Sequence, residues 1–356
     1  MKRPATQSKR KFATLLVLFA SLLSGIHAGS ARAPFAPSEK AEKNPPGSRI
    51  VFSDGFDIYS MSPDGSLLTR LTDSGDGYVY LQPTWSPDHS QIAFVSNRDG
   101  DIEIYAMKAD GSSVRRLTYN PGEDSQPSWS PDGTKIAFVH GDDPSWAGRI
   151  NFLNCEPAQI YVIKADGSGQ KKLTGAANNT DPAWSPDSKQ IAFSSDRDGN
   201  YEIYRMNEDG SGPTRLTFNA VEDADPAWSP DGSRIAYGSG YERVYYFCGI
   251  EGIIQNPFAR TSVSYGGAGE IRVLRLDGTS DLQLTTTNNN SDPAWSPDNG
   301  QIVFASRRDG NFEIYLMDSN GNGTKRLTAT EPADLSPAWS PHLPPVNSFG
   351  AARGKR

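Results

Sequence analysis

The tripeptide Trp-Ser-Pro recurs along most of the chain at nearly constant intervals. The separations between its copies are 44, 55, 44, 67 and 44 residues, so a unit of 44 residues repeats and two of its copies are expanded. A fixed period of this length is typical of repeat architectures, in which each unit forms one small supersecondary element. The copies begin at Trp85, Trp129, Trp184, Trp228, Trp295 and Trp339. A seventh tryptophan, Trp146, lies outside the repeat in the first expansion.

Each unit consists of short apolar segments separated by turn residues. A segment such as 91–95 (Gln-Ile-Ala-Phe-Val) is followed by a polar loop, a segment such as 103–107, an Asp-Gly turn and a Leu-Thr pair. In the turn at 130–133 (Ser-Pro-Asp-Gly), proline presets φ and glycine accepts a positive φ, and we expect His89, Ser188 and Asn299 to occupy that glycine position in other units. Four short strands per unit predict one blade of a β-propeller.

The two ends of the array complement each other. Residues 49–52 resemble a second strand with no Trp-Ser-Pro segment before it, and residues 337–340 resemble a first strand with no second strand after it. We therefore predict an all-β fold over residues 48–342, a six-bladed propeller of four-stranded antiparallel blades. Pairing of the C-terminal strand into the N-terminal blade would close the ring and remove free sheet edges. We expect the repeated tryptophans to pack between neighbouring sheets, each with its N–H bound to a local acceptor.

The first 28 residues have the layout of a secretory signal peptide. Five basic residues precede an apolar run from Phe12 to Ile26, and small residues follow. The run is shorter than the roughly 20 apolar residues that a membrane span needs, so cleavage after Ala28 or Ala31 is preferred to the alternative of an uncleaved anchor. We then expect a flexible segment over residues 29–47 and a flexible basic tail over residues 343–356. The protein is predicted to be periplasmic or secreted.

The charge of the exported part argues against two classes of partner. Removing the five basic residues of the signal peptide from the total of 35 leaves 30 basic residues against 42 acidic ones. Nucleic acids and anionic lipids both require a basic surface, so neither is an expected partner, and no membrane insertion is expected after cleavage.

The repeat resembles that of a known family. Residues 182–187 (Pro-Ala-Trp-Ser-Pro-Asp), 191–193 (Ile-Ala-Phe), 202–204 (Glu-Ile-Tyr), 209–212 (Asp-Gly-Ser-Gly) and 215–217 (Arg-Leu-Thr) are similar to the WD-like repeat of the TolB C-terminal propeller. The resemblance covers residues 48–342. It implies a periplasmic scaffold that holds a partner protein at the mouth of the propeller. We expect the protein to be a monomer. Only about 20 residues separate the predicted cleavage site from the first strand, so the N-terminal α/β domain of TolB is not expected here.

Acidic residues recur where the first strand of each blade is expected to face the central channel. The residues before the repeated proline include Asp181, Asp225 and Asp292, with Gln82, Gln126 and Ser336 in the other blades. Two positions upstream lie Asp124, Asp223 and Asp334, or the asparagines Asn179 and Asn290. One interpretation is that aspartate before proline stabilises an extended turn. The other is that these acids focus a negative field that attracts a cationic partner or a metal ion.

A second acidic motif connects the second and third strands in alternate blades. Its copies span residues 97–103, 196–202 and 307–313, and each contains Arg-Asp-Gly followed by glutamate. Alternating oxygen side chains around a glycine resemble fragments of calcium loops, so calcium is the one cofactor considered. A hairpin bend at Asp-Gly, with the loop arginine paired to the glutamate, explains the same residues without a metal.

The two expansions carry both cysteines. The third blade gains 11 residues around 141–156 and the fifth gains 23 around 240–269, and we expect both insertions on the face where the first strands begin. Cys155 and Cys248 in an exported chain favour a disulfide. Aromatic residues in the insertions suit a protein-binding surface, although a small satellite core is an equal alternative. They include Trp146, Tyr241, Tyr245 and Tyr246.

The sequence contains little that indicates catalysis. It lacks a Gly-x-Ser-x-Gly pentapeptide, and the three histidines after the signal peptide, His89, His140 and His342, are dispersed. We therefore expect a non-catalytic protein-binding scaffold whose partner is an envelope or periplasmic protein. The candidate binding residues are Asp124, Asp181, Asp223, Asp225, Asp292, Trp146, Tyr245 and Tyr246. The alternative is a calcium-dependent or carbohydrate-processing propeller.

Overall fold

The architecture was determined from a computed structural model, which describes residues 47–141, 157–175, 177–247, 261–266, 269–287 and 289–341. Only the backbone is described for residues 242–247 and 261–266. The predicted signal peptide, the N-terminal segment up to residue 46 and the C-terminal tail lie outside these ranges. In the described residues no helix has the length and apolar character needed to cross a membrane.

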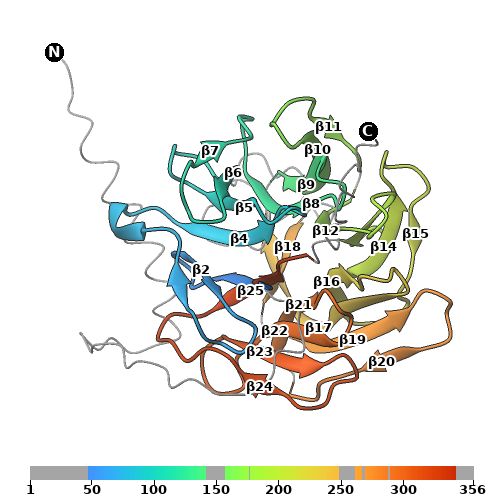
Figure 1. The fold of residues 1–356 in the computed structure, drawn as a ribbon. Helices are drawn as coiled ribbons and strands as arrows, with labels where there is room; N and C mark the ends of the chain where they lie inside the picture. Colours follow the sequence, from blue (N-terminus) through green and yellow to red (C-terminus); the bar gives the residue numbers. More distant parts are fainter. Residues whose placement is uncertain are drawn as a thin grey trace, which may run out of the picture.

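Six antiparallel sheets are arranged in a ring (Figure 1). The first strand of each blade ends at the repeated tryptophan, and the second strand begins a few residues later. The first strands of blades 1 to 6 are β25 (Leu335–Trp339), β4 (Tyr80–Trp85), β8 (Asp124–Trp129), β12 (Asn179–Trp184), β16 (Glu222–Trp228) and β21 (Asn290–Trp295). The second strands are β1 (Ile50–Ser53), β5 (Gln91–Ser96), β9 (Lys135–His140), β13 (Gln190–Ser195), β17 (Arg234–Phe247) and β22 (Gln301–Ser306).

The outer half of each blade consists of a third strand and a very short fourth strand. The third strands are β2 (Ile58–Met61), β6 (Glu103–Lys108), β10 (Gln159–Lys164), β14 (Glu202–Asn207), β19 (Glu270–Arg275) and β23 (Glu313–Asp318). The fourth strands are β3 (Thr69–Arg70), β7 (Arg115–Arg116), β11 (Lys171–Lys172), β15 (Thr214–Arg215), β20 (Asp281–Gln283) and β24 (Lys325–Arg326). Blade 5 carries an additional strand, β18 (Thr261–Gly266), which pairs with the extended end of β17.

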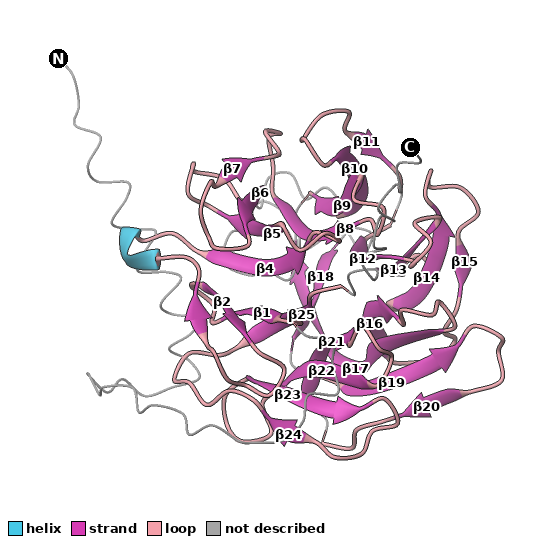
Figure 2. Cartoon of the chain, in the orientation of Figure 1, coloured by secondary structure: helices cyan, strands magenta, loops and turns pink. Residues whose placement is uncertain are grey.

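Strands dominate the described part of the chain (Figure 2). Its one helical element is the 3-10 turn η1 (Ser74–Asp76). The turns between first and second strands have the predicted geometry, because His89, Ser188 and Asn299 have φ values of 60°, 61° and 61° where Gly133 has 72°. The all-β prediction is confirmed.

The ring is closed by the C-terminal strand, as predicted. Ile50 of β1 pairs with Trp339 of β25, and Val51 pairs with Ala338. The N–H of Ser340 donates to the carbonyl of Arg49 at 2.8 Å, which extends the pairing by one residue. Figure 1 shows β25, coloured red, beside the blue strands of blade 1. Six four-stranded blades therefore form one closed propeller.

The repeated tryptophans pack between neighbouring blades. Trp184 contacts Ala137 and Ile160 of blade 3, and five of the six repeated tryptophans are 6–7% exposed. The indole N–H groups of Trp228 and Trp295 donate to backbone carbonyls of the preceding blade at 3.2 Å. Trp228 is half-buried. The other four indole N–H groups have no acceptor among the described residues, so the expected local acceptor is found at two blades only.

Candidate functional site

Six residues with left-handed backbone conformation surround the axis of the propeller. Each precedes the repeated proline of a first strand, and each has a φ of 50–55°. The strand pairing shifts register at this point in every blade, as for β8 between Ser125 and Ser128. A positive φ is uncommon outside glycine and contradicts the extended conformation expected before proline. We call Gln82, Gln126, Asp181, Asp225, Asp292 and Ser336 the central ring.

The central ring lines a cavity on the propeller axis. The cavity has a volume of about 210 Å³, and its wall also includes the prolines that follow the ring residues. Thr84, Ser128 and Ala338, each one residue beyond such a proline, contribute to the wall as well. The cavity therefore extends from the ring toward the ends of the first strands. Asp181, Asp225 and Asp292, predicted to share one opening, lie together around this cavity.

Hydrogen bonds join ring residues of successive blades. The N–H of Gln126 donates to Oε1 of Gln82 at 2.8 Å, and the N–H of Asp181 donates to Oε1 of Gln126 at 2.8 Å. Nε2 of Gln126 also donates to Oδ1 of Asp181 at 2.6 Å. The left-handed backbone thus aims each of these N–H groups at the side chain of the preceding blade. These bonds offset part of the conformational cost of the left-handed residues.

The pKa values of two of the three ring carboxyl groups are raised by their surroundings. Burial raises the pKa of Asp225 well above its usual value, and the charges of Asp181 and Asp292 raise it further. Burial also raises the pKa of Asp292, and the charge of Asp181 adds to this effect. The hydroxyl of Ser291 donates to Oδ2 of Asp292 at 2.8 Å. Like charges around a partly dehydrated cavity cannot all ionise freely, so the ring holds protons more tightly than isolated carboxyl groups do.

Tyr241 connects the insertion of blade 5 to the central ring. Its hydroxyl donates to Oδ2 of Asp225 at 2.6 Å, and burial together with the charge of Asp225 raises the pKa of the phenol. The ring of Tyr241 lies over Gly238, where an added Cβ would be 2.1 Å from the phenol oxygen. Tyr241 is one of the insertion aromatics for which a binding surface and a small satellite core are equal predictions, and its side chain is buried against the central ring. The sequence feature that indicates this contact is the run Gly-Ser-Gly-Tyr at 238–241, because its glycines leave space for the Tyr241 side chain.

The insertions of blades 3 and 5 leave the propeller on the face where the first strands begin. Asp124 at the start of β8 pairs with His140 at the end of β9, and Glu222 at the start of β16 pairs with Tyr241 in β17. We call this the insertion face and the opposite one, which carries the Ser-Pro-Asp-Gly turns, the turn face. Tyr241 therefore approaches the ring from the insertion face.

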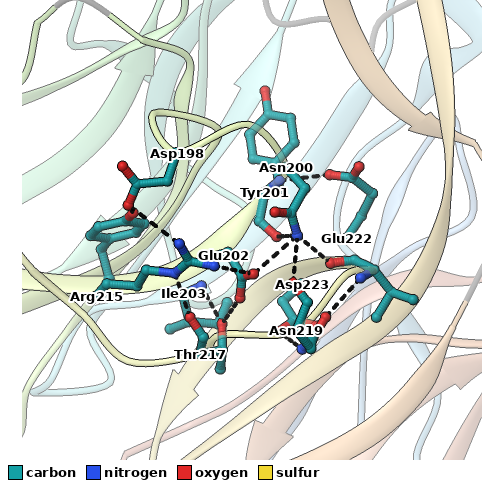
Figure 3. Close-up of polar contacts among 12 residues, drawn as sticks. Asp198, Asn200, Tyr201, Glu202, Ile203, Arg215, Thr217, Asn219, Glu222 and Asp223 are labelled. Carbon is teal, nitrogen blue, oxygen red and sulfur yellow. Dashed lines mark hydrogen bonds and ion pairs between the residues drawn. The ribbon is translucent and has the colours of Figure 1, made fainter.

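Asp124 and Asp223 lie between blades rather than in the cavity, and both side chains are 0% exposed. Figure 3 shows the network that contains Asp223. Glu202 accepts hydrogen bonds from Thr217 at 2.5 Å and from Arg215 at 2.6 Å, while Asn219 donates to Asp223 at 2.6 Å. Burial raises the pKa of Asp223 to about 7, and the charge of Glu202 contributes to this shift.

Blades 2 and 6 contain equivalent networks. Glu103 is bonded to Thr118 at 2.6 Å and shares a hydrogen bond with Asp124, whose Oδ1 lies 2.6 Å from Nδ1 of His140. Burial raises the pKa of Glu103 to about 7, with a further contribution from Asp124. Burial likewise raises the pKa of Asp334 to about 7. Paired carboxyl groups therefore join blade 2 to 3, blade 4 to 5 and blade 6 to 1.

The Arg-Asp-Gly loops of the alternate blades form the predicted hairpin bend, but their arginine and glutamate do not pair as predicted. Asp-Gly forms the bend, with Gly100 at a φ of 117°. The expected pairing of Arg98 with Glu103 is wrong, because Glu103 pairs with Arg116 of the fourth strand and Arg98 lies over the ring of Tyr105. Asp99 accepts a hydrogen bond from Tyr105 at 2.8 Å. Within the described ranges no three His, Cys, Asp or Glu side chains are placed to hold a metal ion.

Several predicted site residues fall where the structure gives no side-chain information. Trp146, Cys155 and Cys248 lie outside the described residues, so the disulfide stays a prediction. Tyr245 and Tyr246 lie in the extended part of β17, where only the backbone is described.

Comparison with known families agrees with the ring architecture. The model of the TolB beta propeller domain matches residues 150–248 and 259–345, which together are more than half of the chain. The model of the Tricorn protease N-terminal beta propeller domain matches residues 44–158.

One relative aligns with most of this chain. A TolB homolog from Chlorobium luteolum is 32% identical over 314 residues, which are 83% of this chain and 60% of the relative. This chain thus spans less than two thirds of that relative's length.

Solved structures share the fold at lower sequence identity. TolB from Acinetobacter baumannii superposes with a TM-score of 0.64 at 22% identity, covering 83% of this chain and 67% of that one. A puromycin-hydrolyzing peptidase from Mycobacterium tuberculosis has a TM-score of 0.53 at 18% identity, covering 79% of this chain and 43% of the peptidase. The family match and the closed six-bladed ring lead to one conclusion, that this chain belongs to the TolB β-propeller family.

Proposed function

We propose that the protein is a non-catalytic binding scaffold of the cell envelope and that its partner is an envelope or periplasmic protein docked on the insertion face. Membership of the TolB β-propeller family supports a scaffold role. The predicted signal peptide supports a periplasmic or secreted location. The acidic composition of the exported part favours a partner that presents a basic segment.

The observation that carries the proposal is the convergence of Asp181, Asp225 and Asp292 at the axis, where Tyr241 of the blade 5 insertion donates to Asp225 from the insertion face. Those ring carboxyl groups that are ionised focus a negative potential along the axis. Tyr241 ties the blade 5 insertion to this ring, so a partner on the insertion face would meet the insertion and the field of the ring together. In this proposal Asp124 and Asp223 act indirectly, by holding neighbouring blades in register.

A catalytic alternative has less support. His140 is bonded to Asp124, and His89 contacts the carbonyl of Pro341, so each of these histidines has a structural role. The calcium-dependent alternative finds no suitable group of ligands in the part of the chain that the structure describes. A protein-binding role requires neither a catalytic histidine nor a calcium site.

The test compares two triple variants, each of which replaces three acidic side chains by their amides. D181N/D225N/D292N removes the acids of the ring, whereas D101N/D277N/E331Q removes three exposed acids elsewhere. Immobilised wild-type protein and the exposed-acid variant are expected to capture the same envelope protein, identified by mass spectrometry, and the ring variant is expected to lose it. Thermal melting separates lost binding from lost folding. Equal capture by a folded ring variant would contradict the proposal.

A further inference from the structure

A second cavity lies between blades 1 and 2 on the turn face. It has a volume of about 450 Å³ and is lined by Arg49, Trp85, His89 and Asp110, among others. Arg49 directly precedes β1, at the point where the C-terminal strand closes the ring. The volume is in the range of small-molecule sites in proteins. We call this cavity the closure groove.

Arg49 forms no ion pair with any described residue, although Asp110 lines the same groove. Its Nε donates to Oγ of Ser60 at 2.9 Å, and Nη2 makes a long contact of 3.4 Å with the carbonyl of Leu67. No carboxylate of the described residues lies within 4 Å of its guanidinium, and burial lowers the pKa of Arg49. Some other arginines that reach into the blades are paired with carboxylates, as Arg116 is with Glu103 and Arg326 with Glu313. Arg197 and Arg308 instead donate to the side-chain oxygens of asparagines. A partly dehydrated cation such as Arg49 attracts an anion.

The repeat provides an internal comparison for this position. Lys135 of blade 3 occupies the position of Arg49, and its Nζ lies 2.5 Å from Oε2 of Glu208 in the next blade. The position of Glu208 is taken by Ala109 in blade 2, so Arg49 lacks the carboxylate that Lys135 has. A carboxylate stands at this position in blade 4 only, and the alanine in blade 2 leaves room for one from outside.

A long side chain that spans other blade junctions is also missing here. Arg115 of blade 2 reaches the carbonyl of Ala165 in blade 3 at 3.0 Å, and Lys325 of blade 6 reaches the carbonyl of Asp64 in blade 1 at 2.9 Å. The equivalent residue of blade 1 is Thr69, which is too short to span the junction. The groove is therefore open at a point where three other junctions, between blades 2 and 3, 3 and 4, and 6 and 1, are bridged.

We propose that the closure groove binds a small monoanionic carboxylic acid, with the carboxylate held by the guanidinium of Arg49. A planar guanidinium binds a carboxylate through two parallel hydrogen bonds. Among the described residues that line the groove, Arg49 is the one arginine or lysine, and the carboxyl group of Asp110 lies in the wall. Because Asp110 repels a second negative charge, a phosphate dianion fits the groove less well than a carboxylate. This site is on the opposite face from the proposed protein partner and does not depend on it.

The first test measures binding by the full-length protein with calorimetry. Benzoate represents a free acid, acetyl-trialanine with a free C-terminus represents a peptide end, and its C-terminal amide and inorganic phosphate are controls. Binding of either acid, without binding of the amide or phosphate, supports the proposal. The acid with the higher affinity shows whether the carboxylate comes from a free acid or from a peptide end. Absence of binding by both acids, or equally tight binding of phosphate, would overturn it.

The second test uses three substitutions. Arg49→Gln removes the cation, and Ala109→Glu supplies an internal carboxylate in the way that Glu208 serves Lys135. Both are expected to weaken binding of the acid at least tenfold, whereas Lys135→Gln, at the equivalent position in blade 3, leaves it unchanged. Ala109→Glu retains Arg49, so it remains informative if the Arg49 variant melts at a lower temperature. Wild-type affinity in a folded Ala109→Glu protein would show that Arg49 is not the ligand.

Discussion

At the scale of single residues, backbone conformation rather than charge decides which side chains reach the axis. Side chains two positions apart on a regular strand share a face. Asp124 and Gln126 therefore ought to point the same way, yet one is buried between blades and the other lines the central cavity. The left-handed residue and the register shift in β8 separate them. Each left-handed residue costs about 1–2 kcal/mol, so the ring maintains a conformation that regular strands avoid.

Gly238 is the residue on which the position of Tyr241 depends most. A methyl group at 238 would overlap the phenol ring, with distances of 2.1–2.6 Å. We expect Gly238→Ala to lower the free energy of unfolding by about 1–3 kcal/mol, as overpacking does in well-packed interiors. Denaturant titration measures this loss.

Gly175 provides the control for this substitution, since an added Cβ there would meet nothing within 4 Å and its φ is not in the left-handed region. Gly175→Ala should change stability by less than about 0.5 kcal/mol. The loss caused by Gly238→Ala should also shrink when Tyr241 is replaced by alanine. An undiminished loss in that double variant would show that Tyr241 does not depend on Gly238.

At the scale of elements, carboxyl pairs link the strands of neighbouring blades and make their junctions sensitive to pH. Asp223 has a folded-state pKa of about 7, well above its unfolded value. Between pH 4 and pH 7 the folded state therefore binds more protons than the unfolded state, and stability falls as the pH rises. A pKa shift of this size changes the free energy of unfolding by at most about 4 kcal/mol.

Asp223→Asn is expected to flatten this dependence. Asn179 and Asn290 occupy the same position in blades 4 and 6, so the fold accommodates an amide there. The variant should match the wild type near pH 4 and exceed its unfolding free energy by about 2 kcal/mol at pH 8. Chemical denaturation across this pH range provides the measurement. Parallel curves for the two proteins would mean that Asp223 does not titrate in this window.

The elements could be predicted from the sequence because their signals are local. The period of 44 residues, the Ser-Pro-Asp-Gly turns and the unmatched strands at both ends are sufficient for six closed blades. The pairing partners of buried charges could not be predicted in the same way. Glu103 takes Arg116 from the fourth strand instead of the nearer Arg98 because the hairpin bend directs Arg98 over Tyr105. The connection between Tyr241 and Asp225 joins residues 16 positions apart through a glycine contact that no strand pattern reveals.

At the scale of the whole molecule, ring closure brings the separate sites together. The acids of the central ring come from blades 4, 5 and 6, and they surround one cavity because the sheets complete a circle. The closure groove exists because the chain ends meet at blade 1, where the usual turn between first and second strands is interrupted. The central claim is therefore that β25 is an integral strand of blade 1.

Hydrogen–deuterium exchange of the full-length protein tests this claim most directly. Backbone amides of β25 that pair with β1 should exchange as slowly as those of β12, an equivalent first strand inside the continuous part of the chain. Exchange of β25 at the rate of an unstructured terminus, with β12 still protected, would contradict the closed ring and the two sites that depend on it.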